Sequence, residues 1–250
     1  MIPLRDDNPA RTTPYVVWAL VAVNVIIYLL EFTGGVVPTR MGMTGPLAGW
    51  ALVPYEFIHG IDIPTNGSTP LQPYWLTLFT AMFMHGGWLH LGGNMLYLMI
   101  FGNNIEDALG HVKFLVFYLV CGVAAALAQI FWNPDSMIPT LGASGAIAGV
   151  LGAYLVLFPR AKVDTLIVMV LITRVRLPAY ILLGFWIVSQ FFSHITGSLA
   201  ARGHETGGVA YLAHIGGFLA GMLLIRLIGA KPPLPPRPDL YEGYRGGGRY

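Results

Sequence analysis

The stretch LGASGAIAGVLGAYLVLF, residues 141–158, is apolar along almost its whole length and long enough to cross a bilayer as a helix. Its glycines recur at spacings of three and four, at Gly142, Gly145, Gly149 and Gly152. This spacing predicts a bare stripe on one side of the helix, where a second backbone can approach closely. Ser144 adds a hydroxyl to the same segment, and taken alone it is either one more small packing residue or a nucleophile.

The composition of the whole chain is that of a polytopic membrane protein. Apolar residues make up 55% of the 250 and charged residues 10%, and the mean hydropathy is +0.64, more than a water-soluble domain needs for its core. We therefore expect an all-α membrane protein, a single bundle of about six transmembrane helices of roughly 20 residues each. A net charge of +2 gives no reason to expect nucleic acid as a partner. Cys121 is the one cysteine, so no intrachain disulfide is possible.

Six apolar segments stand out along the sequence. They cover residues 15–30, 76–101, 114–132, 141–158, 178–192 and 208–228. The Gly- and Pro-rich stretch between the first two carries Trp50, Tyr55 and Phe57, which favours a long loop at the headgroup level. The run from Val163 to Ile172 is apolar but too short to cross a bilayer, so we expect an interfacial or cytoplasmic connection there.

The chain divides on this basis into a cytoplasmic N-terminal segment at 1–12, a membrane domain at 13–229 and a disordered cytoplasmic tail at 230–250. Twelve of the fourteen Lys and Arg residues fall on the side that holds both termini, and only Arg40 and Arg202 fall opposite. Because cytoplasmic segments carry the excess of Lys and Arg, we expect both termini in the cytoplasm. No removable signal peptide is evident at the N-terminus.

The last apolar segment contains a histidine followed by glycines one turn apart, namely His214, Gly217 and Gly221. Two glycine faces pack closely, which would bring the imidazole within about 3 Å of the Ser144 oxygen. A buried histidine bonded to a backbone carbonyl is the alternative for His214 alone. Taken with Ser144, a general base is the better interpretation. The apolar parts of the last three segments hold no Asp or Glu, so the expected arrangement is a dyad without a third, acidic member.

The second apolar segment contributes His85, His90 and Asn94. His90 and Asn94 are four apart and share a helical face, so an imidazole N–H and an amide NH2 could stabilise an oxyanion. Metal binding is the rival interpretation, but the usual pair of ligands is four apart with an acid nearby, whereas His85 and His90 are five apart. We expect His85 to anchor the adjoining loop and Glu106 to be a structural hydrogen-bonding group. No metal and no cofactor are expected.

These motifs together make the sequence resemble the rhomboid family of intramembrane serine proteases, from about Thr13 to Ile228. The family's G-x-S-G motif matches residues 142–145, and its histidine with following glycines matches His214. Its H-x4-H-x3-N motif matches His85, His90 and Asn94. The resemblance implies a six-helix rhomboid-like bundle with Ser144 as nucleophile and His214 as general base. It further implies an oxyanion site made by His90, Asn94 and the backbone N–H of Ser144.

The resemblance also implies a substrate class and a location. The substrates would be single-pass transmembrane proteins, cut next to a small residue where their helix is locally unwound, and the membrane would be the bacterial inner membrane. The alternative is a non-catalytic membrane protein that binds transmembrane helices without cutting them. A transporter is disfavoured because no internal repeat is evident and the polar residues lie on one side.

The sequence departs from the family pattern at two places. Many relatives carry an aromatic–arginine pair before the first histidine, whereas Trp75 is followed here by Leu76 and Thr77. Some relatives place an aromatic residue four positions after the serine, stacked on the catalytic histidine, and Ala148 stands there in this chain. Another group, with Tyr154 as a candidate, or none, would then hold His214.

Overall fold

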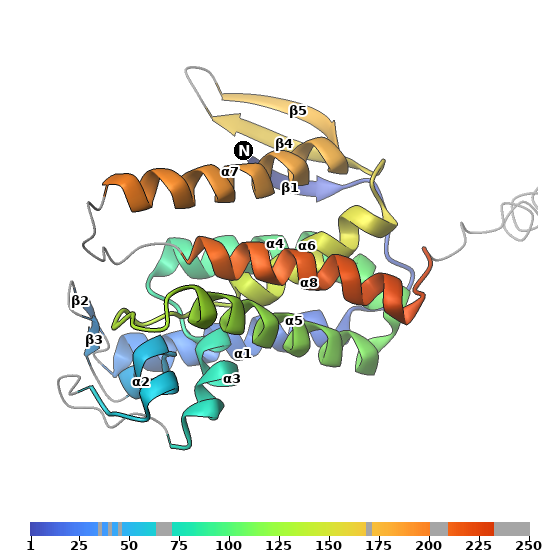
Figure 1. The fold of residues 1–250 in the computed structure, drawn as a ribbon. Helices are drawn as coiled ribbons and strands as arrows, with labels where there is room; N and C mark the ends of the chain where they lie inside the picture. Colours follow the sequence, from blue (N-terminus) through green and yellow to red (C-terminus); the bar gives the residue numbers. More distant parts are fainter. Residues whose placement is uncertain are drawn as a thin grey trace, which may run out of the picture.

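The computed structural model describes residues 1–34, 37–39, 42–44, 47–63, 72–168, 172–200 and 210–232. Its long helices form a bundle (Figure 1). They are α1 (Tyr15–Thr33), α4 (Trp88–Leu109), α5 (His111–Trp132), α6 (Ser144–Leu157), α7 (Ala179–Ala200) and α8 (Tyr211–Ile228). Short helices lie between α1 and α4, at η1 (Ala48–Trp50), α2 (Pro54–His59), η2 (Tyr74–Leu76), α3 (Thr77–Thr80) and η3 (Ala81–Phe83). The predicted helical membrane bundle is confirmed.

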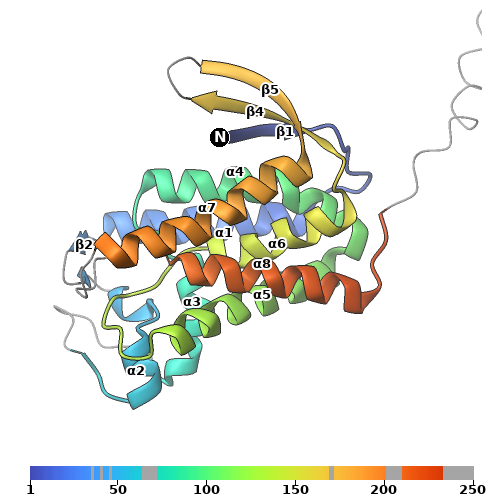
Figure 2. The same cartoon turned by 45° about the horizontal axis from the view of Figure 1, so that its top comes forward.

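Among the described residues, four helices are long and apolar enough to cross a membrane, namely α1, α5, α8 and residues 179–196 of α7. α6 is shorter, with 14 residues, but it lies in the centre of the bundle and is buried from Gly145 to Tyr154. It packs against α4, α5 and α8, as the two views of the ribbon also show (Figures 1 and 2). The catalytic candidate Ser144 is therefore carried by the most enclosed helix.

Three predicted boundaries, on two of the helices, are wrong. The second long helix begins at Trp88 rather than near Leu76, because residues 76–83 form short helical turns and the chain is extended at Met84 and Gly87. The helix then continues to Leu109, beyond the predicted end at Phe101. The fourth predicted segment starts as a helix only at Ser144, because Gly142 adopts a φ of +120°, which a helix does not allow.

The predicted connection at Val163 to Ile172 is part of a small sheet. The antiparallel hairpin of β4 (Lys162–Val168) and β5 (Ile172–Pro178) pairs with the N-terminal strand β1 (Ile2–Asp6) in the order β1-β4-β5. A second two-stranded sheet joins β2 (Val37–Thr39) to β3 (Gly42–Thr44). The helical prediction thus holds for the bundle, and the sheet is an addition to it.

One buried carboxylate ties the three strands of the first sheet together. Asp164 on β4 accepts hydrogen bonds from Arg174 at 2.7 Å, Arg176 at 2.9 Å and Arg5 at 3.0 Å. These guanidinium groups hold the pKa of Asp164 well below its usual range. Arg5 therefore crosslinks the N-terminal strand to the hairpin, and Arg174 and Arg176 crosslink β5 to β4.

A second carboxylate joins the N-terminal strand to the bundle. Asp6 accepts hydrogen bonds from the Tyr154 hydroxyl of α6 at 2.5 Å and from the Asn104 amide of α4 at 2.9 Å. Burial raises the pKa of Asp6 to about 6, although these two hydrogen bonds act in the opposite direction. The position of the strand is thus coupled to the far end of the helix that begins at Ser144.

Glu106 on α4 lies at a junction of three helices. Its carboxylate is fully buried and accepts the backbone N–H groups of Val16 at 2.9 Å and Val17 at 2.8 Å, which are free donors in the first turn of α1. The third contact, at 2.5 Å, is with Nδ1 of His111 at the start of α5. These contacts are those of a structural hydrogen-bonding group.

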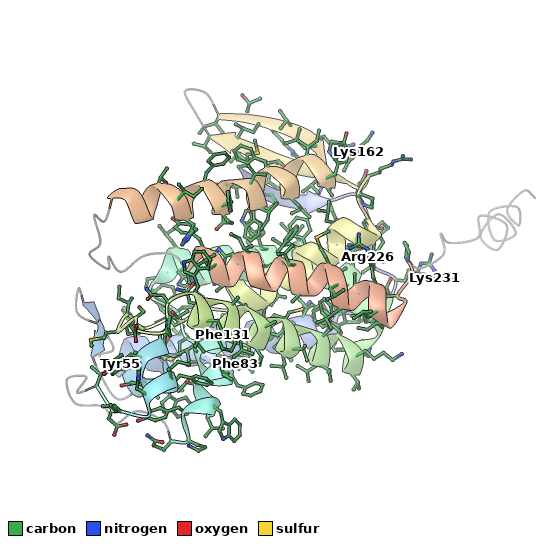
Figure 3. The ribbon with its side chains drawn as sticks, viewed as in Figure 1. Tyr55, Phe83, Phe131, Lys162, Arg226 and Lys231 are labelled. Carbon is green, nitrogen blue, oxygen red and sulfur yellow. The ribbon has the colours of Figure 1, made fainter. Side chains whose placement is uncertain are left out.

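Basic side chains gather at one end of the bundle. Lys162, Arg226 and Lys231 lie at the end where α8 finishes, and Tyr55 and Phe131 lie toward the opposite end (Figure 3). Arg40 and Arg202, the two basic residues predicted on the opposite side of the membrane, lie outside the described residues. The tail beyond residue 232, with its arginines, lies outside them too.

Candidate active site

Ser144 is the first residue of α6, and the backbone in front of it is held in an unusual conformation. Gly142 has a φ of +120° and donates its N–H to the Ala81 carbonyl at 2.8 Å. A Cβ at Gly142 would stand 2.7 Å from Nε2 of His90, so glycine is required both by the backbone and by the neighbouring ring. Gly142 thus shapes the turn before the helix and does not belong to the packing stripe, which corrects its predicted role.

The other glycines bring α6 and α8 into backbone contact. A Cβ at Gly217 would lie 2.1 Å from the Gly145 carbonyl oxygen, and a Cβ at Gly221 would lie 1.9 Å from that of Gly149. The space beside Gly149 is closed on another side by Cys121 of α5. No larger residue at these positions allows the same approach of the two helices, so the glycines determine how near His214 comes to Ser144.

The two helices place the serine and the histidine in direct hydrogen-bond contact. Ser144 Oγ lies 2.7 Å from Nε2 of His214, within reach for proton transfer. His214 lies in the first turn of α8, three residues after its start at Tyr211, whereas a span beginning at Gly208 predicted it roughly two turns in. Its ring is buried. The pair can act as a nucleophile and its base.

The predicted oxyanion donors are His90, Asn94 and the backbone N–H of Ser144. The His90 ring lies beside Gly142, and its Nδ1 accepts the Gly86 N–H at 3.4 Å, which leaves Nε2 as the protonated nitrogen. Asn94 is buried, and its Nδ2 has no hydrogen-bond partner in the described structure. The first N–H groups of α6, at and after Ser144, are free because a helix cannot bond its first turn. Such donors suit a developing oxyanion, helped by the positive end of the helix dipole.

His85 lies behind this site rather than in it. Its backbone N–H is bonded to Glu31 of α1 at 3.2 Å, and its ring packs edge-on against the His90 ring with centroids 5.1 Å apart. These contacts connect the chain before α4 to α1, a position consistent with anchoring the loop.

The neighbours of the His214 ring come from α7 and were not recognised in the sequence. The ring of Trp186 lies over His214 with centroids 5.7 Å apart and an interplanar angle of 34°. Nδ1 of His214 lies 2.7 Å from Oε1 of Gln190. The candidate Tyr154 is wrong, because its hydroxyl is bonded to Asp6 and its ring packs on Phe101. The sequence does contain a signal for Gln190, because a polar amide within an apolar helix needs a hydrogen-bond partner.

A small cavity adjoins the serine. It has a volume of about 40 Å³ and its walls include Gly122, Ala126, Gly145 and Ala146, with Leu78 and Met82 from the turns before α4. Small side chains on α5 and α6 leave this space next to the nucleophile.

Comparison with known proteins identifies the family. The family model described as Rhomboid domain matches residues 72–231, which is more than half of the chain. The chain belongs to the rhomboid family. The match begins before the turns that lead to α4 and ends after α8, so it contains Ser144, His214 and the helices that hold them.

Individual rhomboid relatives come from a yeast, a plant and a bacterium. The chain is 31% identical over 152 residues to Rhomboid protein 1, mitochondrial, of Saccharomyces cerevisiae, covering 59% of the chain and 40% of that protein. It is 28% identical over 165 residues to Rhomboid-like protein 11, chloroplastic, of Arabidopsis thaliana, covering 64% and 55%. It is 39% identical over 84 residues to Rhomboid protease GluP of Bacillus subtilis, covering 34% and 16%. The chain thus spans about half or less of the length of these rhomboid relatives.

Proposed function

We propose that this rhomboid-family membrane protein is an intramembrane serine endopeptidase, with Ser144 and His214 as its catalytic dyad. The observation that carries the proposal is the 2.7 Å contact between Ser144 Oγ and His214 Nε2, where the first turns of the apolar helices α6 and α8 meet. A second support is the name of one relative, Rhomboid protease GluP. Polar residues inside a membrane are costly, so such a pair is by default a functional-site hypothesis.

The reaction follows from the geometry. His214 Nε2 takes the proton of the Ser144 hydroxyl while Oγ attacks the peptide carbonyl carbon, and the carbonyl oxygen becomes an oxyanion. His90 Nε2–H, the Asn94 amide and the Ser144 N–H donate to that oxyanion. The carbon–nitrogen bond then breaks as His214 returns the proton to the leaving nitrogen. His214 Nε2 then takes a proton from a water molecule, whose oxygen attacks the acyl-enzyme carbonyl carbon. The ester bond to Ser144 breaks as Nε2 returns that proton to Oγ, which restores the serine hydroxyl.

The substrates we propose are single-pass transmembrane proteins. A helix hides its carbonyls in hydrogen bonds, so the substrate has to unwind locally before Ser144 can attack. The cavity of about 40 Å³ beside the serine suits a small side chain next to the scissile bond. On this proposal, the residues of α5 and α6 that line the cavity limit the size of the substrate side chain that fits beside Ser144.

For the orientation we propose that both termini face the cytoplasm and that the site opens toward the other side. The support is the basic end of the bundle, with Lys162, Arg226 and Lys231 (Figure 3), because positive charge favours the cytoplasmic side. Two relatives are named mitochondrial and chloroplastic, whereas Rhomboid protease GluP comes from the bacterium Bacillus subtilis. For this chain we propose a bacterial cell (inner) membrane, with the bacterial relative as its support.

Cleavage in liposomes tests the proposal. The full chain is reconstituted with a panel of single-span reporter proteins that differ in the residue before the expected cut, and fragments are identified by mass. We expect cleavage by wild type and none by Ser144→Ala, with Ser193→Ala on α7 as the matched serine-to-alanine control. Cleavage by the Ser144→Ala variant at the wild-type rate would refute the nucleophile. An uncut panel with stable helix binding would favour the non-catalytic alternative.

A further inference from the structure

The catalytic histidine candidate is held from both sides of its ring. Nε2 of His214 faces Ser144 of α6, and Nδ1 faces the side-chain oxygen of Gln190 of α7, each at 2.7 Å. The imidazole therefore bridges α6 and α7, which both pack against α8. Within the described structure, these are the recorded hydrogen bonds of the His214 ring.

The surroundings of Gln190 decide which way its amide points. Its Nε2 faces the backbone carbonyl of Trp186 at 3.4 Å and the hydroxyl oxygen of Ser189 at 3.3 Å. The Trp186 carbonyl can only accept, so the NH2 group belongs on that side and Oε1 belongs on the side of His214. The Ser189 hydroxyl donates its own proton to the same carbonyl at 2.6 Å, which leaves its oxygen to accept from Gln190.

This orientation fixes the tautomer of the histidine. Oε1 can only accept, so Nδ1 of His214 must carry the proton, and the lone pair of Nε2 then points at the Ser144 hydroxyl. That is the tautomer a general base requires. During the reaction Nε2 gains a proton, and the Nδ1–H bond to Gln190 becomes charge-assisted and stronger. The Gln190 amide thus stabilises the protonated His214 that forms during attack more than it stabilises the neutral resting form.

The same helix turn also limits how the ring can rotate. Trp186, four residues before Gln190, lies over the His214 ring and also contacts Phe218, with centroids 6.1 Å apart. Rotation of the imidazole would break the bond to Gln190 and push the ring into Trp186. One face of α7 therefore supplies both a wall and a hydrogen-bond acceptor.

We propose that Gln190 is a positioning residue of the dyad, which selects the Nδ1–H tautomer of His214 and stabilises its protonated form through a neutral amide. This inference rests on the proposed function. A neutral acceptor does the orienting work that a carboxylate does in water-soluble serine proteases, without placing a further charge in an apolar bundle. The role is assigned to a residue on α7, outside the motifs that carry the family resemblance.

The test measures inactivation of the full chain in detergent by a fluorophosphonate probe, with the maximal rate and the half-saturating concentration determined separately. Gln190→Met keeps the length of the side chain and removes the acceptor, whereas Gln190→Glu keeps an acceptor oxygen. The matched control is Gln129→Met on α5, because the Oε1 of Gln129 has no hydrogen-bond partner in the described structure. Thermal unfolding of each variant is followed in parallel.

We expect Gln190→Met to lower the maximal rate about 10- to 100-fold, as loss of one charge-assisted bond predicts, with an unchanged half-saturating concentration. Gln190→Glu should recover much of that rate, and Gln129→Met should equal wild type. A wild-type maximal rate in Gln190→Met overturns the inference. An equal loss of rate in Gln190→Met and Gln190→Glu, together with a higher half-saturating concentration, also overturns it. If Gln190→Met does not fold, Gln190→Ala takes its place. Absence of labelling in wild type would instead refute the proposed function.

Discussion

Replacing Gly221 by alanine tests whether the glycine contact sets the catalytic distance. The added Cβ would lie 1.9 Å from the carbonyl oxygen of Gly149, which is 1.1 Å short of the 3.0 Å that real Cβ contacts respect. The obstructing atoms are backbone atoms, so no side chain can rotate away and α6 and α8 must separate. An equal shift at His214 would lengthen the 2.7 Å contact with Ser144 to 3.8 Å. A separation above about 3.5 Å is no longer a hydrogen bond.

Two effects should follow from this separation. The free energy of unfolding should fall by about 1–3 kcal/mol, the usual cost of overpacking a tight contact. Probe labelling of Ser144 should fall about 100-fold or more, because general-base catalysis contributes roughly 10²–10⁴ in rate. Both are measured on the purified full chain, by thermal unfolding and by the rate of fluorophosphonate labelling.

The matched control is Gly184→Ala on α7, where an added Cβ meets nothing within 4 Å. This variant should label at the wild-type rate and be no less stable, since alanine favours helix by about 1 kcal/mol over glycine. Wild-type labelling and stability in Gly221→Ala would show that the bundle relaxes without moving His214, and the reasoning from backbone contact would be refuted.

Two further predictions concern the sheet and the oxyanion site. Because burial raises the pKa of Asp6 to about 6 from 3.8, the folded state binds its proton more tightly, so the free energy of unfolding should fall as the pH rises from about 4 to 6 and then level off. Over this pH range the fall in the free energy of unfolding should be about 1–2 kcal/mol after solvent screening, and Asp6→Asn should remove it. Thermal unfolding measured against pH tests this, and the same pH dependence in Asp6→Asn as in wild type would contradict it. Asn94→Ala should lower the cleavage kcat about 100- to 1,000-fold with little change in KM, and a normal kcat in the liposome assay would exclude Asn94 as an oxyanion donor.

The sequence was sufficient for the helical bundle and for the pairing of Ser144 with His214. Length and hydropathy predict long apolar helices because the bilayer imposes both, and the six predicted segments correspond to α1, α4, α5, α6, α7 and α8. The glycine spacing on α6 and α8 also carries over directly, since small residues are what allow two backbones to touch.

Other features depend on contacts that the sequence pattern does not show. Helix starts at Trp88 and Ser144 are set by backbone conformations at Gly87 and Gly142, which hydropathy does not report. The sheet forms because a hairpin finds the N-terminal strand more than 150 residues away, held at Asp164 by Arg5. The partner of His214 on α7 is similarly a tertiary contact, recognisable in the sequence only as a polar amide in an apolar helix.

The central claim is that Ser144 is an activated nucleophile, and fluorophosphonate labelling of the full chain tests it most directly. Wild type, Ser144→Ala and His214→Ala are treated in detergent, and the modified residue is identified by mass spectrometry. The account predicts a single adduct on Ser144 in wild type and none in either variant. Labelling that persists in His214→Ala at the wild-type rate, or an adduct on another residue, would contradict the dyad.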